Sequence, residues 1–248
     1  MKFTALFLTV IPSALAATTL HLAGDSTGAT GGSGGTLGWG GFLQDYFYSQ
    51  TVTVNNAAVA GRSSRTFITE GHWTSLMSKT KPNDVVMIQG IGEEFQDTVN
   101  GVTDQPERVF SFGHYLRTMV ADTRVKGAIP VLVSKTLTKK WNNATNGVAR
   151  GDQWSEWSLA VSKSEKTAFL DMRQIAADGY DTMGISVLDK FFPIDGTHTS
   201  PEGARFNTES IIKAIRCVRL PVVRGMSRAG QNVYTPKVCH NSAPIPAA

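Results

Sequence analysis

The sequence predicts an α/β protein in which a parallel sheet is covered by helices on both faces. Two observations lead to this prediction. Short β-rich runs alternate along the chain with longer segments that have helical periodicity. Two of the short runs, Val85–Ile88 and Ile129–Val133, are almost continuously apolar. Strands that are buried on both faces have this composition, which favours a parallel sheet over an antiparallel one.

We expect five strands that alternate with six helices. The strand candidates are Thr18–Ala23, Thr51–Val54, Asp84–Gln89, Ile129–Ser134 and Thr167–Asp171. The helix candidates are Trp39–Ser49, Thr66–Ser78, Pro106–Arg124, Asp152–Glu165, Met172–Leu188 and a last helix from Ser200 to about Ile215. Ser200 is the expected N-cap of that helix, and Pro201 its first residue. The Gly-rich stretch Gly28–Gly41 is predicted to be a flexible loop over the strand ends. It is not a phosphate loop, because no Lys-Ser/Thr follows its glycines at the required spacing.

The first 16 residues are interpreted as a secretory signal peptide. Lys2 precedes the largely apolar run Phe3–Ile11, and Ala14-Leu15-Ala16 has the small-x-small form of a cleavage site. The run is too short to span a bilayer, and no later stretch reaches about 18 apolar residues. We therefore expect a secreted, extracellular protein with no membrane anchor. Residues 17–248 are enough for one domain and contain no repeat or linker.

Charge and cysteines narrow the class further. The formal net charge of +4 becomes +3 without Lys2, and no long basic block is present. This pattern does not indicate nucleic-acid binding, although a mildly basic surface would favour an acidic polymer. The only two cysteines, Cys217 and Cys239, are predicted to form a disulfide in an exported chain, with two unpaired thiols as the alternative. The single Asn-x-Ser/Thr sequon makes Asn143 a candidate for glycosylation.

Two distant segments contain the parts of an activated serine. Gly24-Asp25-Ser26-Thr27 follows the first strand and places the Ser26 hydroxyl on a turn at the strand end. Asp195-Gly196-Thr197-His198 precedes the last helix and contains a carboxylate and an imidazole three positions apart. A hydroxyl, a base and a group that orients the base together form a nucleophilic serine site.

The carboxyl edge of the sheet is the expected place for this site, because ligands of such sheets bind there. Gly61, Gly90–Glu94 and Trp141 follow the second, third and fourth strands and should lie on the same edge as Ser26. Trp141 is equally compatible with stacking on a sugar ring and with packing in a core.

Three blocks of sequence resemble the SGNH (GDSL-type) hydrolases: Gly24-Asp25-Ser26, Ala58–Ser63 and Phe192–Pro201. Within that family the mature chain is most similar to the fungal rhamnogalacturonan acetylesterases. The resemblance implies a flavodoxin-like, three-layer α/β/α fold and removal of O-acetyl groups from a pectic polysaccharide. We expect an acetylated polysaccharide as the only partner, with a monomeric protein and no cofactor or metal.

The same resemblance implies a role for each residue of the site. Ser26 would be the nucleophile, His198 the general base, and Asp195 the residue that orients the base. The backbone N–H groups of Ser26 and Gly61 would donate to the oxyanion. At Gly61 the absence of a side chain lets the backbone approach the substrate.

The block after the third strand departs from the family pattern. Where the family has Gly-x-Asn-Asp, this chain reads Gly90-Ile91-Gly92-Glu93-Glu94. Gly92 therefore stands in place of the Asn whose amide is the third oxyanion donor. Loss of one such donor costs about 10²–10³ in turnover. Two interpretations remain: the donor is replaced by Gln89, Gln96 or Asn100, or the protein is a weakly active or non-catalytic glycan-binding relative.

Overall fold

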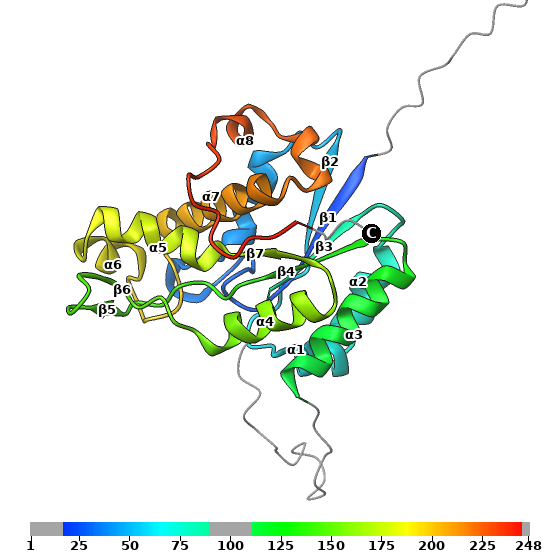
Figure 1. The fold of residues 1–248 in the computed structure, drawn as a ribbon, viewed down its shortest axis with the longest axis horizontal. Helices are drawn as coiled ribbons and strands as arrows, with labels where there is room; N and C mark the ends of the chain where they lie inside the picture. Colours follow the sequence, from blue (N-terminus) through cyan, green and yellow to red (C-terminus); the bar gives the residue numbers. More distant parts are fainter. Residues whose placement is uncertain (1–16, 90–110, 245–248) are drawn as a thin grey trace, which may run out of the picture.

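The centre of the molecule is a five-stranded, fully parallel sheet with the strand order β2-β1-β3-β4-β7 (Figure 1). The computed structural model describes residues 17–89 and 111–244. The strands are β1 Thr18–Ala23, β2 Val52–Asn56, β3 Val85–Gln89, β4 Ile129–Val133 and β7 Ala168–Leu170. All five predicted strands are present, and the predicted α/β fold is confirmed.

Helices cover both faces of the sheet, as expected for strands that are apolar throughout. One face packs against α1 Ser64–Thr69, α2 His72–Lys79, α3 Phe112–Val125 and α4 Gln153–Ser164. The other face packs against the 3-10 helix η2 Trp39–Tyr46, α5 Met172–Met183 and α7 Pro201–Val218. The smaller elements are η1 Ser33–Gly35, the hairpin of β5 Trp141–Asn142 and β6 Gly147–Val148, α6 Ser186–Phe191, η3 Pro221–Gly225 and α8 Arg228–Asn232.

Successive strand residues enter two separate cores, which explains why the strands lack polar alternation. In β3, Val85 and Met87 pack in the core that contains Trp39. Val86 and Ile88 point the other way, into the core on the α1–α4 side. All four strand residues are fully buried. Each buried side chain of this size contributes about 1.5–3 kcal/mol relative to an exposed one.

The last long helix begins where its capping signals predict. The Ser200 hydroxyl accepts a hydrogen bond from Gly203 N, and Pro201 is the first helical residue. The helix continues past the predicted Ile215 and ends at Val218, where the next residue adopts a left-handed conformation. In this way α7 runs the length of the sheet, with its N-terminus next to the catalytic candidates.

Three predicted helices differ from the structure. Thr66–Ser78 is divided into α1 and α2 at Gly71, which has a φ of 84°, and Met172–Leu188 is divided into α5 and α6 at Gly184, with a φ of 79°. Left-handed glycine ends a helix without steric cost. Trp39–Ser49 forms the shorter 3-10 helix η2. The first part of the third helix candidate, residues 106–110 of Pro106–Arg124, lies outside the described residues, as do residues 1–16.

A disulfide joins the C-terminal segment to α7. Cys217, in the last turn of α7, is bonded to Cys239, with the two Cα atoms 5.8 Å apart. The C-terminal segment then reaches the sheet, where Ala243 pairs with Phe169 of β7. Among residues 17–89 and 111–244, no helix combines the length and apolar character needed to cross a membrane.

Candidate active site

Ser26 lies in the turn that directly follows β1. The side chain of Asp25 fixes this turn, because its Oδ1 atom accepts hydrogen bonds from Thr27 N (2.8 Å) and Thr27 Oγ1 (2.7 Å). The Asp25 carbonyl also accepts from Gly28 N at 3.1 Å. Asp25 therefore shapes the backbone around Ser26, which leaves the Ser26 hydroxyl at the strand end, half-buried.

The Gly-rich stretch after Ser26 packs closely against this turn. Trp39 N donates to the carbonyl oxygen of Thr27 at 2.9 Å. A Cβ atom on Gly40 would lie 2.3 Å from the Gly28 carbonyl oxygen, a separation that no side chain tolerates. The packed part of the stretch is Gly38–Gly40, whereas residues 30–35 are exposed and their flexibility stays a prediction. The end of the stretch forms the start of η2, and Gly38 and Gly40 support the turn through backbone contacts that require glycine.

Asp195 and His198 lie in the loop between α6 and α7. Asp195 Oδ1 accepts from the backbone N–H groups of Thr197 and His198, each at 2.7 Å, and Oδ2 lies 2.7 Å from His198 Nδ1. The bond from His198 N, followed by the bonds from the His198 ring and Thr197 N, lowers the pKa of Asp195 to about 2. The carboxylate is thus ionised at neutral pH and holds the imidazole through Nδ1.

The second ring nitrogen of His198 meets the nucleophile candidate. Its Nε2 atom lies 2.9 Å from Ser26 Oγ, across a sequence separation of 172 residues. With the ring proton on Nδ1, facing Asp195, Nε2 accepts the Ser26 hydroxyl. The side chains of His198 and Asp195 are 37% and 44% exposed, so a large substrate has access to this arrangement. The structure brings together all three residues that the sequence singles out.

Neighbouring segments hold the His198 loop in register with the Ser26 turn. Leu37 N donates to the Thr199 carbonyl at 2.9 Å, and Thr199 Oγ1 donates back to the Leu37 carbonyl at 3.0 Å. From the loop after β4, Lys139 N donates to Gly196 O at 2.8 Å, and Lys139 Nζ donates to Phe192 O at 3.3 Å. The loop is therefore tied on both sides to segments that follow β1 and β4.

Gly61 lies in the turn between β2 and α1 with a φ of 75°, a conformation that other residues rarely adopt. The next residues fix this turn, since Ser63 forms a capping box with Thr66 at the start of α1. Within the described part of the chain, neither Ser26 N nor Gly61 N donates a hydrogen bond to another protein group. Two such donors suit a developing oxyanion.

The third oxyanion position is described only in part. Gly92, Gln96 and Asn100 lie outside the described residues. Gln89, by contrast, is 1% exposed at the end of β3, where its Oε1 atom accepts from Trp39 Nε1 at 3.3 Å. Its Nε2 atom is buried and has no hydrogen-bond partner among the described residues. Its Oε1 atom also accepts from Thr27 Oγ1 at 3.4 Å and so supports the Ser26 turn, while a role of Gln89 as the third oxyanion donor stays a prediction.

A buried arginine that the sequence did not single out organises the loops after β4. Arg173 lies in the first turn of α5 and is 4% exposed. Its guanidinium donates to four backbone carbonyls at 2.6 to 3.2 Å, those of Thr136, Ala149, Arg150 and Gly151. The segment that begins at Thr136 is the one that continues to Lys139 and contacts the His198 loop. The one local signal is a cation at a helix N-terminus, where the helix dipole disfavours it.

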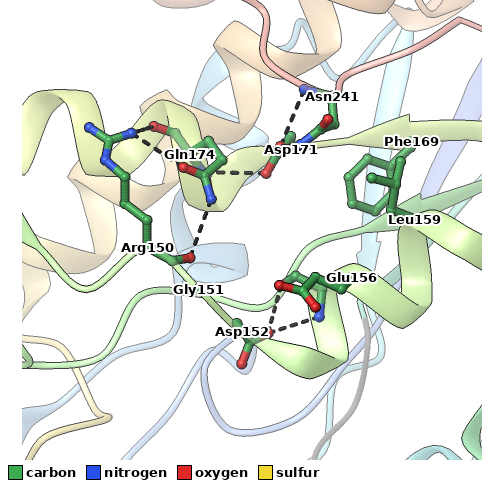
Figure 2. Close-up of a pocket in the computed structure, with 10 residues that line it drawn as sticks. Arg150, Gly151, Asp152, Glu156, Leu159, Phe169, Asp171, Gln174 and Asn241 are labelled. Carbon is green, nitrogen blue, oxygen red and sulfur yellow. Dashed lines mark hydrogen bonds between the residues drawn. The ribbon is translucent and has the colours of Figure 1, made fainter.

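A small pocket opens between the N-termini of α4 and α5, beyond the ends of β4 and β7 (Figure 2). Two of its three carboxylates, those of Asp152 and Asp171, have hydrogen-bond partners. Asp152 caps α4 by accepting from Ser155 N, and Asp171 accepts from Asn241 Nδ2 at 2.8 Å. The three catalytic candidates do not line this pocket. We therefore assign its polar side chains to helix capping and to attachment of the C-terminal segment.

The hairpin β5–β6 contains Trp141 and Asn143, two residues that the sequence singles out. Trp141 is half-buried and packs against the core that contains Tyr180 and Phe192. Core packing is therefore the reading that the structure supports for Trp141. Asn143 is exposed between the two strands of the hairpin, which is compatible with glycosylation. In the described ranges, no three His, Cys, Asp or Glu side chains are grouped to hold a metal ion.

Comparison with known proteins defines the class. The family model described as "GDSL-like Lipase/Acylhydrolase" matches residues 20–211. The chain belongs to this family, which confirms the resemblance seen in the three sequence blocks. It is accordingly an ester hydrolase.

Two curated relatives align with most of the chain. A rhamnogalacturonan acetylesterase from Emericella nidulans is 30% identical over 230 residues, which cover 85% of this chain and 89% of the relative. A probable rhamnogalacturonan acetylesterase from Bacillus subtilis, YesY, is 27% identical over 220 residues, with coverage of 84% and 96%.

Solved structures share the fold. The crystal structure of YxiM from Bacillus subtilis superposes with a TM-score of 0.70 at 20% identity. That match covers 83% of this chain, and the chain spans 58% of the YxiM chain. An acetylxylan esterase from Geobacillus stearothermophilus superposes with a TM-score of 0.55 at 18% identity and coverage of 81% and 95%. At these identities the structural matches support the fold alone.

Proposed function

We propose that the chain is a secreted serine esterase that removes O-acetyl groups from a pectic polysaccharide of the rhamnogalacturonan type. The observation that carries the proposal is the hydrogen-bonded series of Ser26, His198 and Asp195, with distances of 2.9 and 2.7 Å. Such a series supplies a nucleophile, a general base and a carboxylate that orients the base. Secretion rests on the predicted signal peptide in residues 1–16.

In the first half-reaction, Ser26 Oγ attacks the carbonyl carbon of the acetyl ester while His198 Nε2 takes the hydroxyl proton. The carbonyl oxygen becomes an alkoxide, and the N–H groups of Ser26 and Gly61 stabilise its charge. The bond from the carbonyl carbon to the sugar oxygen then breaks as His198 returns the proton to that oxygen. The products are acetyl-Ser26 and a free sugar hydroxyl. Asp195 stays ionised throughout and stabilises the imidazolium.

In the second half-reaction, His198 Nε2 takes a proton from water, and the water oxygen attacks the acetyl carbon. The same backbone donors stabilise the second alkoxide. Collapse of this intermediate releases acetic acid, and His198 returns the proton to Ser26 Oγ. Water is the only co-reactant, and every atom is accounted for in the acid and the alcohol.

Two findings support an acetylated polysaccharide as the substrate. The relatives that align over most of the chain are described as rhamnogalacturonan acetylesterases. The exposure of His198 and Asp195 is compatible with a polymer that enters from the side. A buried, enclosed site would instead suit a small ester.

The catalytic assignment is tested by covalent labelling. A fluorophosphonate probe should label Ser26, and both Ser26→Ala and His198→Ala should abolish labelling. Ser33→Ala, a change at an exposed serine of the neighbouring stretch Gly28–Gly41, should leave labelling intact. Labelling that survives His198→Ala would remove His198 as the activating base.

The substrate class is tested by acetate release from two polymers. We expect a higher kcat/KM on acetylated rhamnogalacturonan than on acetylxylan, with no release by the Ser26→Ala variant. Faster release from acetylxylan would reject the pectic substrate and retain the esterase. Binding of a polymer without acetate release from any ester would favour the glycan-binding alternative, the interpretation that Gly92 raises.

A further inference from the structure

The positive charge of this protein is concentrated at one end of the chain. Residues 17–209 contain 17 Lys and Arg against all 20 Asp and Glu, a net charge of −3. Residues 210–248 contain six Lys and Arg and no acidic residue, a net charge of +6. The scattered appearance of the basic residues in the sequence therefore conceals a strong asymmetry. The six cations are Lys213, Arg216, Arg219, Arg224, Arg228 and Lys237.

The fold gathers these six residues, here called the basic surface, at one end of the molecule. They lie on the last turns of α7, on η3 and α8, and on the segment that the disulfide ties back to α7. In Figure 1, α8 lies at the end of the molecule opposite α1 and α4. The catalytic loop precedes the other end of α7. An 18-residue helix places the two ends roughly 27 Å apart.

The cations of the basic surface form no ion pairs with acidic side chains among the described residues. Arg219, Arg224, Arg228 and Lys237 are exposed, and Lys213 and Arg216 are half-buried. The nearest acid on the same helix is Glu209, one turn before Lys213, which accepts a hydrogen bond from Tyr46. A cluster of unpaired cations creates a positive potential that attracts a polyanion.

An exposed aromatic ring lies within the same surface. Tyr234 is 66% exposed, and the ammonium of Lys213 lies 4.8 Å from the centre of its ring. Arg216 Nε donates to Thr235 Oγ1 at 3.2 Å, which fixes the segment next to this tyrosine. A flat ring flanked by cations can stack on a sugar while the cations pair with its carboxylate.

We infer that the basic surface binds an acidic polysaccharide, a polymer of uronic acid residues, at a site separate from the catalytic residues. The choice of a polysaccharide over another polyanion rests on the proposed function, since a galacturonan carries one carboxylate on each uronate. Such a surface holds the polymer while Ser26 acts on acetyl groups elsewhere along it. It lowers KM for the polymer and does not change the chemistry of ester cleavage.

The test measures binding of polygalacturonate, which contains no acetyl group, to the full chain with Ser26→Ala. The variant of the basic surface combines Arg224→Gln, Arg228→Gln and Lys237→Gln. A matched control combines Lys81→Gln, Lys126→Gln and Lys163→Gln, three exposed cations on the α1–α4 side that form no ion pair among the described residues. Both variants lose three positive charges. Methyl-esterified polygalacturonate and duplex DNA are the comparison ligands.

We expect the basic-surface variant to weaken polygalacturonate binding about tenfold or more at low salt, with a shallower salt dependence. The control should change it less than about twofold, and methyl esterification should abolish binding. Equal loss in both variants, no binding, or tighter binding of DNA than of polygalacturonate would overturn the inference. Failure of the unsubstituted protein to cleave any acetyl ester would reject the proposed function and leave this binding result standing.

Discussion

Asp195 accepts three hydrogen bonds, two from backbone N–H groups and one from the His198 ring. Together they lower its pKa from 3.8 to about 2. A depressed carboxyl pKa means that the ionised form is favoured in the folded protein, so the contribution of these bonds is present above pH 3.8 and is lost as the pH falls through about 2. Protonation of Asp195 therefore does not explain any loss of activity above about pH 3.

Replacement of the carboxylate tests its orienting role. Asp195→Asn should lower kcat by up to about 10⁴-fold with a smaller change in KM, because an amide can donate to Nδ1 and favour the wrong tautomer of His198. The measurement is kcat and KM for a small acetyl ester, with circular dichroism to verify the fold. A loss of less than tenfold would mean that another group orients the imidazole.

At Gly92 the test adds a group instead of removing one, because the side-chain donor of the family pattern is missing at this position. Gly92→Asn should raise kcat on an acetyl ester by about 10²-fold or more, since the added hydrogen bond strengthens mainly in the transition state. High activity of the unsubstituted protein without any gain would show that another residue already supplies the donor. If the single variant Gly92→Asn shows no gain but the double variant Gly92→Asn/Glu93→Asp does, the longer side chain of Glu93 obstructs the pocket.

At the residue scale, the sequence predicted the residues that the structure brings together. Ser26, Asp195 and His198 were predictable because each belongs to an uninterrupted block whose residue types match one chemistry. Arg173 was not, because nothing near it in the sequence shows that four carbonyls from two loops converge on its guanidinium. The buried position of Gln89 likewise depends on contacts with Trp39 and Thr27, which only the fold creates.

Arg173 attaches the segments after β4 and β6 to the start of α5 through four hydrogen bonds. Arg173→Met should destabilise the protein by about 3 kcal/mol, because it leaves one buried carbonyl and three partly buried ones without their donor. For a chain of this size, that corresponds to a fall of roughly 6–12 °C in Tm. Thermal unfolding followed by circular dichroism provides the measurement.

The same variant also tests the connection from the loop after β4 to the catalytic candidates Ser26 and His198. Because the loop contacts the backbone of Gly196 through Lys139, kcat should fall several-fold at a temperature where Arg173→Met is fully folded. Gln153→Ala, at an exposed position on the first turn of α4, is the matched control and should leave Tm and kcat nearly unchanged. A variant with normal Tm and kcat would show that the loop holds its shape without the guanidinium.

At the scale of elements, the strands were predicted better than the helices. The buried strands have an apolar composition that is visible locally, whereas the breaks at Gly71 and Gly184 depend on positive φ values that a glycine permits but does not require. The hairpin β5–β6 was missed because strands of two residues are too short to show an alternation of apolar and polar side chains. Its position follows from packing of Trp141 and Val148 on the core beside α5 and α6.

At the scale of the whole molecule, the basic surface and the catalytic candidates lie at opposite ends of the sheet. The carboxyl edge carries the catalytic candidates, and the end of α7 carries the basic surface. Along the sequence the cations look scattered because they form no contiguous block; residues 210–248 differ from the rest of the chain in having no acidic residue, and the fold then brings their cations to one end. A polymer that contacts both ends would be held over a distance much longer than one sugar.

The amino-terminal half of the sheet contains a buried polar pair that couples global stability to pH. His21 of β1 is 1% exposed; its Nε2 atom lies 3.2 Å from Asp84 Oδ2, and its Nδ1 atom lies 2.8 Å from Asn55 Nδ2. Since an amide nitrogen only donates, Nδ1 is an acceptor and the ring proton is on Nε2, facing Asp84. Burial lowers the pKa of His21 from 6.5, with a smaller contribution from Lys79, and Asp84 opposes the shift.

Because the pKa of His21 is lower in the folded protein, the unfolded chain binds more protons between the two pKa values. The free energy of unfolding should therefore fall as the pH decreases below 6.5, and it should stop falling once the pH is below the pKa of His21 in the folded protein. His21→Gln removes this titration. Urea unfolding at pH 7.5 and pH 5 should show a larger decrease for the unsubstituted protein than for the variant, and parallel decreases would contradict the prediction. If His21→Gln does not fold, an NMR titration of the unsubstituted protein decides the matter, since an imidazole already protonated at pH 6.5 would be incompatible with a neutral, buried His21.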